Sequence, residues 1–256
     1  MAITGTERDA DLVVVRARVR VDAVARTRAD TLAVPAEVRI PGAAAAGASQ
    51  RCTGATFSHS YNPRMPPEHF AQHFSEHQRV IAACIASLQP TSDAAAQAII
   101  SCLGRGGKIL AFGNGGSATQ ASHLVEELIG RYKETRRPLP AISLVGDAGV
   151  VTCIANDFGY GALFERQVEG LAVMGDAVVG ITTSGRSENV LRGLKAAKEK
   201  GAVTIALCGK HGLTGGDADH VIAVPSEEGA YIQEVHLILI HVWCVAVDTT
   251  IKEGGL

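Results

Sequence analysis

The sequence predicts a three-layer α/β/α sandwich built on a five-stranded, mostly parallel sheet and preceded by N-terminal helices. Short apolar runs of about five residues alternate with helical stretches of about a dozen residues or more, which implies crossover connections and a sheet covered on both faces. Strands are expected at 108–112, 141–145, 176–181, 203–207 and 220–224. Helices are expected at 66–88, 92–103, 117–131, 159–173, 187–200 and 230–251.

Composition agrees with this architecture and excludes several classes of protein. Aromatic residues make up only 4%, while small apolar residues are abundant, which suits helices packed on a parallel sheet. The formal charge of −2 gives no basic field for nucleic acid or an anionic membrane. The longest apolar stretches fall short of the roughly 20 residues of a membrane span. The six cysteines contain no C-x-x-C pair and are expected to be reduced and buried in a cytoplasmic protein.

The chain divides into two parts near Met65. Residues 1–64 alternate apolar and charged residues and then pass into the linker-like stretch "PGAAAAGASQ", so we expect a poorly ordered extension. This extension has no apolar core typical of a secretion signal, so export is not expected. Residues 65–256 are expected to form one α/β domain.

Two loops at strand-to-helix junctions have the composition of anion-binding sites. The first is Gly113-Asn114-Gly115-Gly116-Ser117, and the second runs from Thr182 to Asn189 as "TTSGRSEN". Backbone N–H groups in a glycine-rich turn and at a helix N-terminus hold a phosphate well, and so do hydroxyl groups. The alternative is that these residues only cap helices and form turns. A dinucleotide site is disfavoured, because G-x-G-x-x-A at 113–118 lacks the acidic residue expected about 20 positions later, and a Walker lysine is missing.

Two helices carry polar residues that could meet. His123 and Glu127 share one face of the helix behind the first loop, unless they are simply a solvated pair. The apolar helix 230–251 carries Gln233 and His241, and a histidine on such a helix is often a satisfied core residue. If these four residues converge, two imidazoles, a carboxylate and an amide oxygen would suit a divalent ion such as zinc.

At this point a family resemblance enters. The segments "GNGGSATQASHLVEELIGRY", "ANDFGYGALFERQVE", "GITTSGRSENVLRGLKAAKEKGA" and "IQEVHLILIHVWC" resemble the phosphoheptose isomerases of the SIS (sugar isomerase) superfamily, over residues 66–250. The resemblance implies a flavodoxin-like SIS fold and a cytoplasmic homotetramer with active sites near subunit interfaces. It also implies interconversion of sedoheptulose 7-phosphate and glycero-manno-heptose 7-phosphate, the first step of nucleotide-activated heptose biosynthesis. Zinc would be the cofactor and no nucleotide is implied.

The resemblance also implies roles for individual residues. Glu127 and His241 would be the acid–base pair, with Glu127 lifting the carbon-bound proton and His241 moving protons on the oxygens. Arg131 would approach a neighbouring site. Zinc would be held by His123, Glu127, Gln233 and His241. Substrate would be bound by Asn114, Gly115, Gly116, Ser117, Glu127, Asn156, Asp157, Thr182, Thr183, Ser184, Ser187 and Gln233.

Two positions depart from the family pattern. Thr182 replaces a frequent serine, and Ala230 stands where some members carry an acidic residue, which leaves substrate preference open. Three other functions remain as alternatives: a non-catalytic SIS tetramer that contacts a replication initiator, an SIS sensor of a transcription regulator, and an isomerase of another phosphosugar. The apolar surplus of helices 66–88 and 230–251 predicts burial between subunits in a homo-oligomer.

Overall fold

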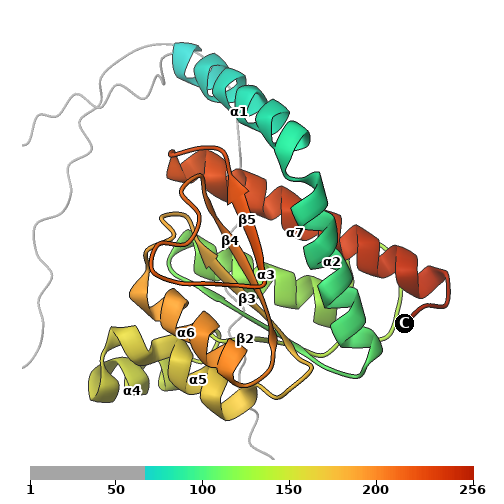
Figure 1. The fold of residues 1–256 in the computed structure, drawn as a ribbon. Coiled ribbons are helices and arrows are strands. Elements are labelled where there is room, and N and C mark those ends of the chain that lie inside the picture. Colours follow the sequence, from blue (N-terminus) through green and yellow to red (C-terminus); the bar gives the residue numbers. More distant parts are fainter. Residues whose placement is uncertain (1–66) are drawn as a thin grey trace, which may run out of the picture. The chain divides into compact units, whose positions relative to one another are not determined.

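The computed structural model describes residues 67–256, so the expected extension at 1–64 lies outside the described residues. Helices and strands alternate along the described chain as expected (Figure 1). The elements are α1 Pro67–Ser87, α2 Gln89–Gly104, β1 Ile109–Gly113, α3 Gly116–Ile129, β2 Ala141–Ser143, α4 Ala148–Phe158, the 3₁₀ helix η1 Tyr160–Ala162, α5 Leu163–Leu171, β3 Ala177–Thr182, α6 Glu188–Glu199, β4 Val203–Gly209, β5 His220–Val224 and α7 Gly229–Lys252.

The five strands form one sheet in the order β2-β1-β3-β4-β5, and every neighbouring pair is parallel. This confirms the predicted fold class. After β1 the chain forms β2 on one side of β1, and it then crosses to form β3 on the other side of β1. In sheets with this order, ligands bind where the carboxyl ends of the two central strands diverge, here β1 and β3.

Helices cover both faces of the sheet (Figure 1). A hydrophobic core lies on each face. Side chains alternate along β1: Ile109 and Ala111 join the core beneath α1, α2, α3 and α7, while Leu110 and Phe112 join the core beneath α4, α5 and α6. Burial on both faces explains why the strands read as continuous apolar runs without alternation. The sequence thus specifies three layers.

The region between β2 and α5 differs from the prediction. The strand expected at 141–145 ends at Ser143, and helix α4 was missed. The Asp147 side chain accepts a hydrogen bond from the Val150 N–H at 3.0 Å and so starts α4. The helix expected at 159–173 is η1 followed by α5, and Gly159 at φ 83° separates η1 from the end of α4.

Helix α7 requires a correction of the statement about apolar stretches. By length and composition it could cross a membrane. Here it packs against α2, α3, β4 and β5, and it buries Trp243 and the charged Asp248. Its composition is therefore that of a core helix in this fold.

The described cysteines are free, as expected, and four of the five are buried. Burial raises the pKa of the Cys208 thiol to about 11. Burial and then the charge of Glu127 raise the pKa of the Cys244 thiol to about 12. Cys153 is exposed on α4, contrary to the expectation that all would be buried.

Candidate active site

The two predicted anion-binding loops lie side by side at the carboxyl ends of β1 and β3. These strands are paired along their length, with Gly113 opposite Ile181. The side-chain amides of Asn114 and Asn189 donate to each other's oxygen at 2.9 Å in both directions, which ties the loops together. The Tyr160 hydroxyl also donates to the Asn114 oxygen at 2.8 Å. The amide of Asn114 is thus held by three hydrogen bonds at the point where the sheet order reverses.

The first loop brings backbone N–H groups to this edge. A Cβ atom on Gly113 would lie 2.8 Å from the Ile181 carbonyl oxygen, so only glycine permits the close approach of β1 to β3. Gly115 adopts φ 55° and precedes α3, and no side-chain hydrogen bond caps this helix. Ser117, predicted to contact substrate, is almost fully buried. The loop therefore offers its backbone more than its side chains to a ligand.

The second loop clusters hydroxyl groups. The Thr182 hydroxyl lies 3.0 Å from that of Ser187 and 3.5 Å from that of Ser184. Ser187 occupies the N-cap position of α6, yet its hydroxyl makes no capping bond to the helix. Ser187 therefore does not cap α6, whereas the Ser184 hydroxyl accepts the Arg186 N–H at 3.2 Å, as the turn-forming alternative predicts. Gly185 adopts φ 66°, and a Cβ there would overlap the Gly212 carbonyl oxygen, so the loop conformation requires glycine.

A cavity of about 300 Å³ opens beside the second loop. Two positively charged side chains, Arg186 and Lys210, line it together with His211, which would favour an anionic ligand. Lys210 also pairs with Glu227 at 2.5 Å. Sequence reasoning missed Lys210 because it lies after β4, outside both recognised loops. The cavity is lined by Thr183, Ser184, Arg186, Gly209, Lys210, His211, Ser226, Glu227, Gly229 and Ile232.

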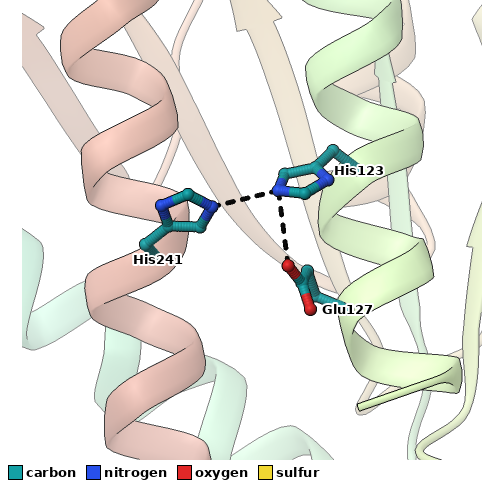
Figure 2. Close-up of side chains that lie close together, drawn as sticks. All are labelled: His123, Glu127 and His241. Atoms are coloured by element: carbon teal, nitrogen blue, oxygen red, sulfur yellow. Dashed lines mark hydrogen bonds and ion pairs between the residues drawn. The ribbon is translucent and has the colours of Figure 1, made fainter. Parts of the chain in front are cut away.

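His123, Glu127 and His241 converge between α3 and α7, as Figure 2 shows. The two histidine Nε2 atoms are 3.0 Å apart, although the residues are 118 positions apart in sequence. Glu127 Oε1 lies 3.5 Å from His123 Nε2, and its side chain is only 12% exposed. Tyr132 stacks on His241 with ring centroids 5.3 Å apart. Three of the four residues expected to converge therefore meet, and Glu127 is not a solvated side chain.

The donors of this cluster fit a divalent ion. One ligand atom from each of the three residues lies within 4.8 Å of the others, and two imidazoles with one carboxylate are typical zinc ligands. Gln233, the fourth predicted ligand, belongs to α7 and its side chain lies against the start of α3: a Cβ on Gly116 would be 2.5 Å from its Nε2 atom. The Gln120 amide donates to the Gln233 backbone oxygen at 2.5 Å. Gln233 thus contacts the glycine loop.

Three other predicted residues stand apart from these contacts. Asn156 donates to Asp157 at 2.7 Å, and both are exposed at the end of α4. Their link to the first loop is indirect, through Tyr160 in the following 3₁₀ helix. Arg131 is exposed and donates weakly to the Lys133 carbonyl at 3.5 Å. Ala230 lines a cavity of about 530 Å³ with His73, Lys210 and other polar residues.

Several buried polar residues that support the site were not predicted. Gln120, Asn189 and Asp248 are all less than a tenth exposed. Polar side chains at such positions would be costly without hydrogen bonds. Their local sequence gives no sign of burial, except that Gln120 and His123 follow one face of α3 with the buried residues Leu124 and Leu128.

Comparison with known proteins places this geometry in a family. The SIS domain family matches residues 72–209. The chain is 50% identical over 156 residues to a phosphoheptose isomerase of Aquifex aeolicus, covering 60% of this chain and 82% of that protein. It is 47% identical over 162 residues to a phosphoheptose isomerase of Solidesulfovibrio magneticus, covering 63% and 79%.

Solved structures agree. A phosphoheptose isomerase from Francisella tularensis superposes with a TM-score of 0.67 at 34% identity, covering 71% of this chain and 97% of that one. One from Neisseria gonorrhoeae gives a TM-score of 0.64 at 38% identity, covering 71% and 98%. The shared fold, the similarity in sequence and the convergence of the predicted residues agree with one another: the chain belongs to the SIS domain family and, within it, to the phosphoheptose isomerases, a family of isomerase enzymes.

Proposed function

We propose that this isomerase interconverts D-sedoheptulose 7-phosphate and D-glycero-D-manno-heptose 7-phosphate through an enediol. The observation that carries the proposal is the convergence of His123, Glu127 and His241. An aldose–ketose isomerisation needs one base to move a carbon-bound proton and one acid to protonate the carbonyl oxygen. A carboxylate on α3 and an imidazole on α7 supply those two groups within a few ångströms of each other.

In the direction from ketose to aldose, the Glu127 carboxylate takes the proton from C1 while His241 donates a proton to the C2 oxygen. The product of this step is the 1,2-enediol. Glu127 then returns its proton to C2, and His241 regains a proton from the C1 hydroxyl as the C1 carbonyl forms. Atoms and electrons balance without an external oxidant, because one carbon is oxidised as its neighbour is reduced.

The fit of the donor set supports zinc as the resident ion. His123, Glu127, Gln233 and His241 would hold it, and Gln233 would reach it from α7 beside the start of α3. When bound, the ion would supply Lewis-acid polarisation of the substrate carbonyl. The chain's own residues orient the sugar and carry the protons.

Phosphate would be gripped by the second loop. Thr182, Thr183, Ser184 and Ser187 offer hydroxyl groups beside the cavity that contains Arg186 and Lys210. Asn114, Gly115, Gly116 and Ser117 would contact the sugar from the first loop, with Asn156 and Asp157 farther out. Binding energy at the phosphate end would position the reacting carbons, which raises the rate without a change in the chemistry itself.

The exposed apolar residues support assembly into a homo-oligomer, and we propose the family's cytoplasmic tetramer. A single chain leaves large apolar side chains exposed on both α1 and α7, where they would favour contact with another copy. Arg131 would then be supplied to a neighbouring site. These exposed residues are Phe70, Phe74, Ile85, Leu237, Ile238, Val242 and Val245.

The experiment is an NMR assay of the purified protein with sedoheptulose 7-phosphate in D₂O, with and without a chelator and with zinc added back. The aldose should appear with deuterium incorporated from solvent, and the chelator should slow turnover if zinc is the resident ion. Ketoses of other chain lengths, each with a terminal phosphate, test whether another phosphosugar is preferred. Absence of turnover and of deuterium exchange with every sugar would leave the non-catalytic binding protein as the better explanation.

A further inference from the structure

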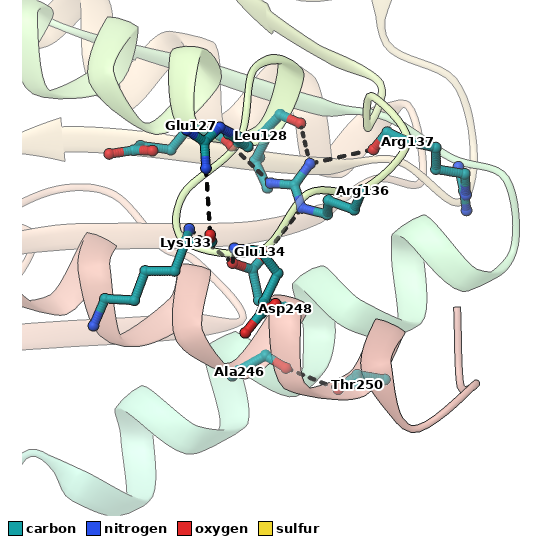
Figure 3. A network of polar contacts seen from close by, with 10 residues as sticks. Glu127, Leu128, Lys133, Glu134, Arg136, Arg137, Ala246, Asp248 and Thr250 are labelled. Atoms are coloured by element: carbon teal, nitrogen blue, oxygen red, sulfur yellow. Dashed lines mark hydrogen bonds and ion pairs between the residues drawn. The ribbon is translucent and has the colours of Figure 1, made fainter.

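A buried ion pair, Arg136 with Asp248, joins the loop after α3 to the end of α7 (Figure 3). The Arg136 Nε donates to Asp248 Oδ1 at 2.8 Å, and both side chains are at most 5% exposed. The other Asp248 oxygen accepts the backbone N–H groups of Lys133 and Glu134 at 3.1 and 3.2 Å. One carboxylate on α7 thus fixes both the guanidinium and the backbone of the loop.

The guanidinium also grips the end of α3. Its Nη2 donates to the Glu127 carbonyl oxygen at 2.7 Å, and its Nη1 donates to the Leu128 carbonyl oxygen at 2.8 Å. These carbonyls belong to the last turn of α3, where helix hydrogen bonding leaves oxygens without partners and a positive charge is favoured. Arg136 therefore holds the backbone of the very residue whose carboxylate is the proposed base.

The same pair reaches the proposed acid. Asp248 follows His241 by about two helical turns, so both side chains project from the same side of α7. Tyr132, in the loop whose backbone Asp248 fixes, stacks on the His241 ring. The ion pair therefore acts on both groups. Arg136 holds the backbone of Glu127, and Asp248 holds the loop whose Tyr132 stacks on His241.

We propose that Arg136 and Asp248 are positioning residues that set the placement of Glu127 relative to His241. This inference rests on the proposed function. Neither residue touches the reacting atoms: Arg136 acts through the α3 backbone, and Asp248 acts through α7 and the Tyr132 loop. A pair that served stability alone would change the unfolding equilibrium and leave the chemistry intact.

The test replaces both charges at once, because removal of one partner strands the other in a buried site and can prevent folding. The variant is Arg136→Met with Asp248→Asn, in which the asparagine oxygen still accepts the two backbone N–H groups. The matched control is Lys108→Met with Asp176→Asn. Asp176 is likewise buried, pairs with Lys108 at 2.6 Å and accepts the N–H groups of Lys108 and Val173, but this pair lies at the amino ends of β1 and β3.

Four quantities are measured on each full-length protein: the melting temperature, the kcat and the KM for sedoheptulose 7-phosphate, and the zinc affinity by chelator competition. In the Arg136/Asp248 variant we expect kcat and zinc affinity to fall about 10- to 100-fold, as for other residues that orient ligands from behind. The KM should change little, since the proposed phosphate loop follows β3, whereas Arg136 lies in the loop after α3 and Asp248 lies on α7. The Lys108/Asp176 control should lose thermal stability without the loss in kcat or zinc affinity.

Equal kcat and zinc affinity in wild type and the Arg136/Asp248 variant would overturn the inference, and so would an equal loss in the control. If the double variant does not fold, Arg136→Lys decides, because lysine can pair with Asp248 but cannot grip both carbonyls of α3. A wild type that binds zinc yet fails to turn over the heptose refutes the proposed function only, and zinc affinity then decides the positioning role. A wild type that does neither refutes both.

Discussion

Glu127 and Glu126 provide a sharp test of the proposed chemistry, because they are adjacent on α3 and both contact His123. Glu126 Oε2 lies 3.0 Å from His123 Nδ1, and its side chain is 68% exposed. Glu127 Oε1 lies 3.5 Å from His123 Nε2, and its side chain is 12% exposed. Substitution of each by glutamine removes one carboxylate and changes the shape of the side chain very little.

The expected effects differ because the two carboxylates have different roles. Loss of a general base costs about 10²- to 10⁴-fold in rate, which corresponds to roughly 3–5 kcal/mol of transition-state stabilisation. An exposed ion pair contributes about 0–1 kcal/mol, so Glu126→Gln should lower kcat by no more than about fivefold. Glu127→Gln should still fold, since the bond from Arg136 is made to its backbone carbonyl and survives the substitution.

The assay follows both turnover and deuterium wash-in at C1 by NMR, with the KM measured in parallel. Glu127→Gln should lose turnover and exchange together while its KM stays close to that of wild type, because the proposed phosphate site is on β3 and α6. If Glu127→Gln keeps more than about a tenth of the wild-type kcat, or if Glu126→Gln loses as much, Glu127 is not the base.

Three further predictions concern binding, packing and pH. Ser187→Ala should raise KM and weaken competition by inorganic phosphate, with kcat nearly unchanged, because the Ser187 hydroxyl does not cap α6 and is proposed to bind the phosphate instead. An unchanged KM would contradict this prediction. Gly193→Ala should lower the free energy of unfolding by about 1–2 kcal/mol in urea titrations, because its Cβ would meet the Phe112 ring at 2.8 Å, while the control Gly170→Ala, with nothing within 4 Å, should not destabilise. Burial lowers the pKa of His236 to about 4, so the unfolded chain takes up a proton at higher pH than the folded chain does. The free energy of unfolding should therefore fall as pH drops from about 6.5 towards 4. His236→Gln should make this dependence on pH less steep, and an unchanged dependence would refute the role of His236.

Much of the fold could be predicted because burial on both faces of the sheet leaves a clear sequence pattern. Each strand is a short apolar run, and each following loop contains glycine or hydroxyl residues. Helix α4 was missed although its apolar residues Val150, Ile154 and Phe158 recur at helical spacing, and only Ile154 of this short helix is buried. The order of the strands depends on long-range pairing that local periodicity does not contain.

The site was predictable in part for similar physical reasons. His123 and Glu127 are four residues apart on one helix, so their shared face follows from helical geometry. Their approach to His241 depends on how α3 and α7 pack, and the residues alone left that question open. Arg136 and Asp248 gave no signal, because an arginine in a polar loop and an aspartate near a helix end are ordinary until both are found buried.

The acid–base cluster is divided between α3 and α7, which are distant in sequence, whereas both anion-binding loops lie on the central strands β1 and β3. Displacement of a packed helix breaks no hydrogen bonds of the sheet ladder, because a helix makes its backbone hydrogen bonds within itself, whereas opening of the sheet breaks them. Detachment of α7 alone would therefore separate Glu127 from His241 and leave the hydroxyl groups of the second loop assembled. Under mild denaturation, this enzyme should lose catalysis while it can still hold inorganic phosphate, so residual phosphate binding is a poor indicator of an intact catalyst.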